Sequence, residues 1–282
     1  MSFLFSKFSD ALKNAMDTRT YGVYYTEERF PDLNVKPGNC HEVILCLAGS
    51  GLFLADGKIC TINSGDLMVL NQFDPYKVIP QKGRAIARFG IVIHPDYVSH
   101  NSTDKTDLSL CFYERENTSP NIISLSDTEI SKLERLFVSF RNNNSYGDDI
   151  LKNSAINMML VHINKYFANH KKNDAENNLN LESLSTSLEY INLNFKNDIK
   201  LKAIAENSHI SVNQLCKLFK IHLETTVTKY ITAKRICEAK KLLCSGKSVS
   251  ETALLCGFSD YANFIRVFKK VTGIPPGKYS KL

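Results

Sequence analysis

The C-terminal part of the sequence states one pattern twice, and this repeat constrains the fold more than any other feature. In each copy, a short segment with apolar residues at helical spacing meets a break, and a capping residue then opens a second such segment. The break is Ser208-His209 in the first copy and Cys256-Gly257 in the second, and the capping residues are Ser211 and Asp260. Two helices joined by a tight turn define a helix-turn-helix. The repeat therefore predicts two helix-turn-helix units within residues 200–279.

Apolar residues and turn residues of the C-terminal hundred positions fall into three blocks. The blocks comprise Ile210-Ser211, Leu215 and Leu218-Phe219-Lys220; Tyr230-Ile231, Arg235-Ile236, Ala239 and Leu242-Leu243; and Ala253, Cys256-Gly257-Phe258-Ser259-Asp260, Phe264, Val267-Phe268-Lys269-Lys270-Val271-Thr272-Gly273-Ile274-Pro275-Pro276 and Tyr279. These blocks resemble the AraC/XylS family of bacterial transcription regulators, the third block most specifically. Two residues depart from the family pattern: Glu224 stands where the family usually has Gly, and Ser280 where it usually has Arg.

The resemblance implies a regulator that binds double-stranded DNA, acts as an activator and has neither enzymatic activity nor a cofactor. RNA polymerase is left open as a further partner. The expected C-terminal fold is all-α, with the two units joined by one helix over Thr225 to Cys244. Twenty residues of helix span ~30 Å, and one turn of B-DNA is ~34 Å long. The two recognition helices can therefore enter successive major grooves.

The exposed side of each predicted recognition helix supplies the residues that we expect to read bases. Lys217 and Arg266 suit guanine, Asn213 and Asn263 suit adenine, and Cys216 and Ala262 suit an apolar contact with a thymine methyl group. By the resemblance, these are the positions that the family uses. The full set of expected base contacts is Asn213, Cys216, Lys217, Tyr261, Ala262, Asn263 and Arg266.

Charge is distributed unevenly along the chain. Residues 181–282 carry 16 Lys and Arg against 8 Asp and Glu, whereas residues 1–180 carry 19 against 21, and the whole chain has a net charge of +6. A basic C-terminal third favours a polyanionic partner for that third. The expected phosphate contacts, which position the protein without specifying a sequence, are Lys202, Lys220, Lys247, Ser248, Lys269 and Lys270.

Cysteine usage and hydropathy indicate the compartment. The eight cysteines form no C-x-x-C pair and show no zinc-finger spacing, so we expect reduced core thiols. No apolar run approaches the length of a membrane span, and the N-terminus has no basic segment followed by an apolar one. We expect a cytoplasmic protein without a membrane partner.

Residues 20–100 are rich in short β-forming segments separated by Gly, Asn and Asp turns, without intervening helices. Such spacing predicts a β-barrel or jelly roll. The expected strands cover residues 42–47, 52–54, 58–62, 66–70 and 85–93. The order of Glu42, Gly49-Ser50-Gly51, Gly65-Asp66-Leu67 and Asp74-Pro75-Tyr76 resembles the cupin-type effector domain of sugar-responsive AraC/XylS members.

The same resemblance bears on what the barrel binds. Lys36, Gly38 and Tyr76 occupy the positions at which enzymatic cupins hold a metal with histidines, so we expect no metal. Cys40-His41-Glu42 is not a metal site either, because adjacent strand residues point to opposite faces. We expect a polar effector, a sugar by the resemblance or else a carboxylate, at the mouth of the barrel. The expected contacts are Lys36, Glu42, Tyr76 and Arg88, with the alternative that Glu42 only fixes a turn.

A helix over residues 148–170 is apolar on two sides and needs two partners. We interpret one side as packing on the barrel and the other as a homodimer interface; the alternative is that both sides are intramolecular core. The predicted domains are residues 1–170 for effector sensing and dimerisation, a linker over 171–180, and residues 181–282 for DNA binding. The alternative function is a constitutive or partner-regulated DNA-binding protein whose barrel serves only dimerisation, and an enzyme in the barrel is a further alternative.

Overall fold

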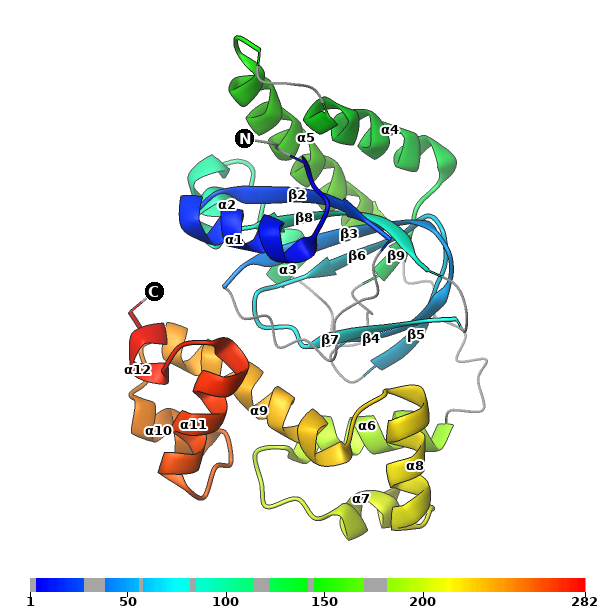
Figure 1. Ribbon diagram of the computed structural model, residues 1–282, viewed down its shortest axis with the longest axis vertical. Helices are drawn as coiled ribbons and strands as arrows, with labels where there is room; N and C mark the ends of the chain where they lie inside the picture. Colours follow the sequence, from blue (N-terminus) through cyan, green and yellow to red (C-terminus); the bar gives the residue numbers. More distant parts are fainter. Residues whose placement is uncertain are drawn as a thin grey trace.

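The computed structural model describes residues 4–27, 39–55, 58–81, 85–113, 122–141, 145–169 and 182–281. Strands dominate the N-terminal part, and helices alone make up the C-terminal part from residue 182 onward (Figure 1). The predicted combination of a β-rich N-terminal region with a helical C-terminal region is therefore confirmed. The predicted linker lies outside the described residues. No helix among the described residues is long and apolar enough to span a membrane.

The larger sheet has six strands in the order β1-β2-β8-β3-β6-β9. All neighbouring pairs are antiparallel except β1 with β2. The strands are β1 (Leu4–Phe5), β2 (Tyr21–Thr26), β3 (His41–Ala48), β6 (Asp66–Leu70), β8 (Ala87–Ile93) and β9 (Ile122–Ser124).

The smaller sheet has three antiparallel strands in the order β5-β4-β7, namely β4 (Gly51–Ala55), β5 (Lys58–Ile62) and β7 (Tyr76–Pro80). Side chains of both sheets share one core, in which Ile44 and Met68 of the large sheet meet Phe53 and Val78 of the small one. We call the two sheets the sandwich. Helix α1 (Phe8–Thr18) covers part of the large sheet next to β2. The two sheets therefore face each other across this core.

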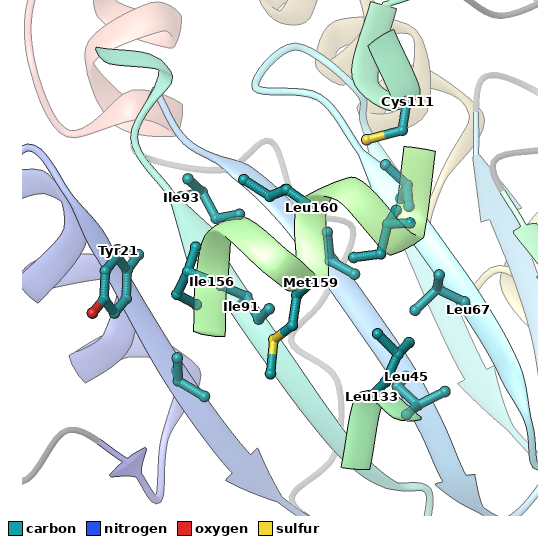
Figure 2. Close-up of a cluster of buried hydrophobic side chains, with 14 of the residues drawn as sticks. Tyr21, Leu45, Leu67, Ile91, Ile93, Cys111, Leu133, Ile156, Met159 and Leu160 are labelled. Carbon is teal, nitrogen blue, oxygen red and sulfur yellow. The ribbon is translucent and has the colours of Figure 1, made fainter. Parts of the chain in front are cut away.

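Helices cover the outer face of the large sheet. Ile156, Met159 and Leu160 of one helix and Leu133 of another pack on strand residues such as Leu45 (Figure 2). The four helices of this part are α2 (Pro95–Asn101), α3 (Leu110–Tyr113), α4 (Asp127–Val138) and α5 (Asp148–Asn169), with a 3-10 turn at Ser139–Arg141. The predicted helix over residues 148–170 is confirmed as α5. Along α5, Ala155 lies in this core, whereas Leu151 and Met158 are exposed.

The C-terminal part contains two helix-turn-helix units on either side of a long helix. The first unit is α7 (Leu201–Asn207) and α8 (Val212–His222), and the second is α10 (Val249–Leu255) and α11 (Tyr261–Thr272). Helix α6 (Glu182–Asn194) precedes them, α9 (Val227–Cys244) connects them, and α12 (Pro276–Tyr279) follows. Each unit has its own apolar core, around Leu215 and Phe219 in the first and around Phe264 and Phe268 in the second.

The sandwich and the helical part share an apolar contact. Leu54 and Ile59 of the small sheet belong to the same buried cluster as Leu184 and Leu188 of α6. Figure 1 shows α6 lying below β4 and β5, with the remaining C-terminal helices on the same side. Full burial of a Leu or Ile side chain stabilises a fold by about 1.5–3 kcal/mol, so these contacts hold the two parts together.

Candidate DNA-binding surface and interior polar cluster

Both recognition helices begin at the predicted caps. The Ser211 hydroxyl oxygen accepts a hydrogen bond from the backbone N–H of Gln214 at 3.2 Å. The Asp260 carboxylate accepts from the backbone N–H groups of Ala262 at 2.8 Å and Asn263 at 3.1 Å. These bonds satisfy N–H groups that a helix start leaves without an intrahelical partner. The predicted starts of α8 and α11 are therefore confirmed.

The predicted base-reading residues occupy the outer sides of α8 and α11. Because Leu215 and Phe219 on α8 and Phe264 and Phe268 on α11 are fully buried, the opposite side of each helix faces solvent. The expected base contacts are exposed on α8 (Asn213, Cys216, Lys217) and exposed or half-buried on α11 (Tyr261, Ala262, Asn263, Arg266). Their contact with bases stays a prediction.

Two of these residues, Asn263 and Arg266, are hydrogen-bonded to each other. A guanidinium N–H of Arg266 donates a hydrogen bond to the Asn263 side-chain oxygen at 2.9 Å. The two residues lie one helical turn apart, so this bond fixes the direction of the Arg266 side chain. A guanidinium held in this way can present two donors to guanine at a small entropic cost.

The predicted phosphate contacts are all exposed. Lys202 pairs with Glu206 at 3.7 Å, and Lys247 pairs with Glu251 at 2.9 Å, each along one helix. Exposed pairs of this kind contribute little to stability, so phosphate oxygens can replace the carboxylates. The positions of the six residues (Lys202, Lys220, Lys247, Ser248, Lys269, Lys270) are compatible with their expected role, which stays a prediction.

The two units are held together through α9 and the segment after α6. Arg235 of α9 donates to the backbone oxygens of Phe195 at 2.7 Å and Asn197 at 2.8 Å. The Lys196 ammonium group pairs with Glu238 at 2.6 Å. Gly257 in the second turn touches the same segment, since a Cβ added there would lie 2.4 Å from the Lys196 backbone oxygen. These contacts restrict how far the units can move relative to each other.

A buried polar cluster lies between the two sheets. The hydroxyl groups of Tyr24 and Tyr76 donate hydrogen bonds to the two carboxylate oxygens of Glu42, at 2.8 and 2.9 Å. Burial raises the pKa of both phenols well above the ordinary value, and the charge of Glu42 raises it further. The Arg88 guanidinium opposes this rise and lies in the same interior. The cluster thus combines a carboxylate, two neutral phenols and a cation.

Three of the four predicted effector contacts come together in this cluster, and the fourth lies outside the described residues. Glu42, Tyr76 and Arg88 are at most 2% exposed, so their expected place at the mouth is wrong, because they lie inside the sandwich. Lys36 is the residue that the structure does not describe. The sequence reasoning missed Tyr24. Its strand, Tyr21–Thr26, is rich in β-forming residues, and this signal could have found it.

In the Cys40-His41-Glu42 run, the side chains of His41 and Glu42 project to opposite faces of the sheet, as strand alternation predicts. The His41 ring stacks on Phe112 at a centroid distance of 4.2 Å on the outer face of the large sheet, whereas Glu42 faces the interior. Cys40 packs with residues of α1. Within the described ranges, no three His, Cys, Asp or Glu residues are placed to hold a metal ion.

Residues 204–282 match the family model of a helix-turn-helix domain. An uncharacterised HTH-type transcriptional regulator of Pseudoalteromonas carrageenovora is 38% identical over 92 residues, which are 33% of this chain and 55% of that protein. Another from Staphylococcus aureus is 24% identical over 265 residues, 93% of this chain and 34% of that protein. This chain therefore spans about a third of the length of that relative.

Among solved structures, a transcriptional regulator from Chromobacterium violaceum, described as containing an AraC-type DNA-binding domain, is 28% identical. The match covers 35% of this chain and 89% of that one, with a TM-score of 0.34. The two turns, their caps and the family match define a helix-turn-helix protein. By this domain, residues 204–282 are similar to the DNA-binding domain of AraC-type helix-turn-helix regulators.

Proposed function

We propose that this protein is a sequence-specific DNA-binding transcription regulator, an activator controlled by a small polar effector. The observation that carries the DNA-binding role is the pair of capped recognition helices, each with polar side chains on the exposed side. An isolated polar helix face is usually just solvated. The same arrangement at matching positions of two units supports DNA reading.

The purified full chain tests this role by selection of binding fragments from a pool of random-sequence duplex DNA. We expect enrichment of sites with two conserved segments about one helical turn apart, which is ~10 base pairs. Recovered fragments that share no sequence would contradict specific reading. The selected site would also locate target promoters, at which activation and contact with RNA polymerase can be assayed.

We further propose that α5 forms a homodimer interface. Ile150, Leu151 and Met158 are 67%, 64% and 51% exposed, an apolar surface on a helix whose other side packs on the large sheet. A charge at the interface should separate the subunits, so Met158→Glu should sediment as a monomer that still binds one half-site. Asn153→Glu, at an exposed position on another side of α5, is the matched control. A Met158→Glu variant that stays dimeric, or fails to fold, counts against this interface.

The effector site that we propose is the polar cluster of a cupin-like sandwich. Glu42, Tyr24 and Tyr76 suit the hydroxyl groups of a sugar, whereas Arg88 and Lys36 suit a carboxylate. A ligand that binds only the folded protein raises the melting temperature further as its concentration rises. We expect a shift from a panel of sugars and sugar acids, and a weaker one for Tyr76→Phe. A shift from a fatty acid, with none from the sugars, would contradict a polar effector.

One observation favours a second candidate, a constitutive DNA-binding protein whose sandwich serves dimerisation. Both oxygens of Glu42 already accept hydrogen bonds from side chains of the protein, so this carboxylate is satisfied without a ligand. In that case no small molecule shifts the melting temperature. Tyr76→Phe then destabilises the sandwich, because it leaves a buried carboxylate oxygen with one hydrogen bond fewer.

A further inference from the structure

Lys77 is a buried lysine at the contact between the sandwich and the helical part. Its side chain is 3% exposed. In the small sheet it pairs with Leu54, and cross-strand partners project to the same face. Leu54 belongs to the buried cluster that also contains residues of α6 and of the first helix-turn-helix unit. Lys77 therefore points out of the sandwich and into this contact, away from the interior cluster.

Glu224 is the ionic partner of Lys77 and has an unusual backbone. It lies between α8 and α9, and its carboxylate is 3.4 Å from the Lys77 ammonium nitrogen. Its φ of 47° is in the left-handed region, which a residue with a Cβ adopts only at an energetic cost. The matching residue after α11 is Gly273, with a φ of 83°. A glutamate at such a position needs a reason, and the ion pair with Lys77 supplies one.

The two partners are in different environments. The Glu224 side chain is 63% exposed, so water solvates its charge with or without Lys77. Lys77, in contrast, makes no hydrogen bond from its ammonium group within the described part of the chain, and its charge is stabilised through Glu224. Loss of Glu224 would leave a buried, uncompensated ammonium group, which must regain water. Loss of the Lys77 charge would leave only a solvated carboxylate.

A second contact joins the C-terminal half of α9 to the sandwich. The Lys240 ammonium group donates a hydrogen bond to the Gln72 backbone oxygen of the sandwich at 2.9 Å. Helix α9 has 18 residues and so spans ~27 Å, shorter than the ~34 Å of one DNA turn. A shift of the units relative to each other, or a bend of the DNA, would adjust the spacing of the two recognition helices to that of successive grooves. Contacts that fix both halves of α9 to the sandwich oppose such a shift.

We propose that Glu224 keeps the first helix-turn-helix unit closed against the sandwich by compensating the buried charge of Lys77, an arrangement that we call the latch, and that the closed form binds DNA more weakly than the open form. The inference rests on the DNA-binding function proposed above. It adds a means of control, since a change that leaves the buried charge of Lys77 without compensation by Glu224 should strengthen DNA binding.

Three variants of the full chain test the latch. Glu224→Gln keeps the shape of the side chain and removes its charge, so the buried ammonium group should open the contact. Lys77→Met replaces the buried charge by an apolar chain of similar length, so the contact should stay closed. In the double variant no uncompensated charge remains. The contact should therefore be closed again, although Glu224 is absent.

Two measurements apply to each variant: the radius of gyration from small-angle scattering without DNA, and the affinity for a random-sequence DNA duplex at low ionic strength. Glu224→Gln should expand the chain and raise the affinity by about fivefold or more, the usual scale of coupling between sites. Lys77→Met and the double variant should match the wild type or bind more weakly.

Expansion and tighter binding in Glu224→Gln, both abolished by Lys77→Met, would support the latch. An unchanged Glu224→Gln, or an equal gain in the Lys77→Met background, would overturn it, and expansion without a gain in affinity would overturn its inhibitory role. A wild-type chain that binds no DNA would refute the proposed function instead, and scattering would still decide whether the latch exists.

Discussion

The two helix-turn-helix units place left-handed residues at matching positions but use different residue types there. Each unit has a left-handed residue in its turn and another after its recognition helix. In the second unit both are glycines, Gly257 and Gly273, with φ of 78° and 83°. In the first unit they are His209 and Glu224, with φ of 55° and 47°. A left-handed residue with a Cβ costs ~1–2 kcal/mol, so the first unit carries strain that the second avoids.

Packing explains part of this difference. A side chain at Gly257 would overlap the Lys196 backbone oxygen, so that turn excludes every residue but glycine. His209 is exposed, and its side chain meets no such restriction. Glu224 uses its side chain to contact the sandwich. The second unit is therefore shaped by contacts within the helical part, and the first by its contact with the N-terminal part.

The largest expected effect comes from Gly257→Ala. Left-handed strain and overlap with the Lys196 oxygen should together lower the free energy of unfolding by ~2–4 kcal/mol. His209→Ala at the matching position should change it by less than ~1 kcal/mol, because His209 already has a Cβ. Urea denaturation followed by circular dichroism measures both. Equal losses would show that the close approach of Lys196 does not distinguish the turns.

A second comparison concerns DNA reading at matching positions of α8 and α11. Arg266→Ala should cost ~1–3 kcal/mol on the selected site and relax the preference at one base pair. Lys217→Ala should cost less, because an ammonium group cannot form the two-donor contact. Lys269→Ala is the control: it should weaken binding to all sequences and reduce the salt dependence. If Arg266→Ala loses affinity equally on specific and random DNA, its assignment to base reading is wrong.

His209→Gly should raise the free energy of unfolding, in contrast to the loss expected for Gly257→Ala in the second unit. Removal of the Cβ relieves left-handed strain but adds freedom to the unfolded chain, so we expect a net stabilisation of about 0.5–1 kcal/mol. The urea midpoint should rise without a change in slope. A lower midpoint would show that the imidazole makes a stabilising contact that outweighs the strain.

The smallest expected effect is a difference in reactivity between two cysteine thiols, Cys216 and Cys256. Burial raises the pKa of Cys256 in the second unit to about 12, whereas Cys216 on α8 is exposed. Iodoacetamide at pH 8 should therefore modify Cys216 and spare Cys256, and bound DNA should protect Cys216. Mass spectrometry of peptides gives the result; rapid modification of Cys256 would contradict its burial.

The raised pKa also means that Cys256 favours folding below its unfolded pKa of ~8.5, and that this contribution declines as pH rises towards 12.

Local signals in the sequence were sufficient for the helical part. Ser211 and Asp260 mark helix starts because a cap depends only on the next few residues. Strands β3 to β6 were also predicted, since turn residues bound them. Strands β2 and β7 and helix α1 were not predicted: β7 ends in Pro80 and shows no clear alternation, and α1 follows an N-terminal stretch without a distinct cap.

Long-range contacts could not be predicted in the same way. Lysine is normally a surface residue, and nothing near Lys77 or Lys240 in the sequence shows that the other domain buries them. The interior cluster was predicted in part, because the resemblance to cupin-type effector domains singled out Glu42 and Tyr76. Its depth depends on how the two sheets close over it, which a pattern along one strand does not contain. The departure at Glu224 was visible, but its ionic partner was not.

Strand β7 places two kinds of contact next to each other along the chain. Tyr76 donates its hydrogen bond inside the sandwich, and the following residue, Lys77, forms its ion pair outside. Successive residues of a strand are ~3.3 Å apart and project to opposite faces. The hydrogen bond of Tyr76 inside the sandwich and the ion pair of Lys77 with Glu224 are thus separated only by the thickness of one sheet. A displacement of Tyr76 would therefore reach Lys77 through a single peptide bond.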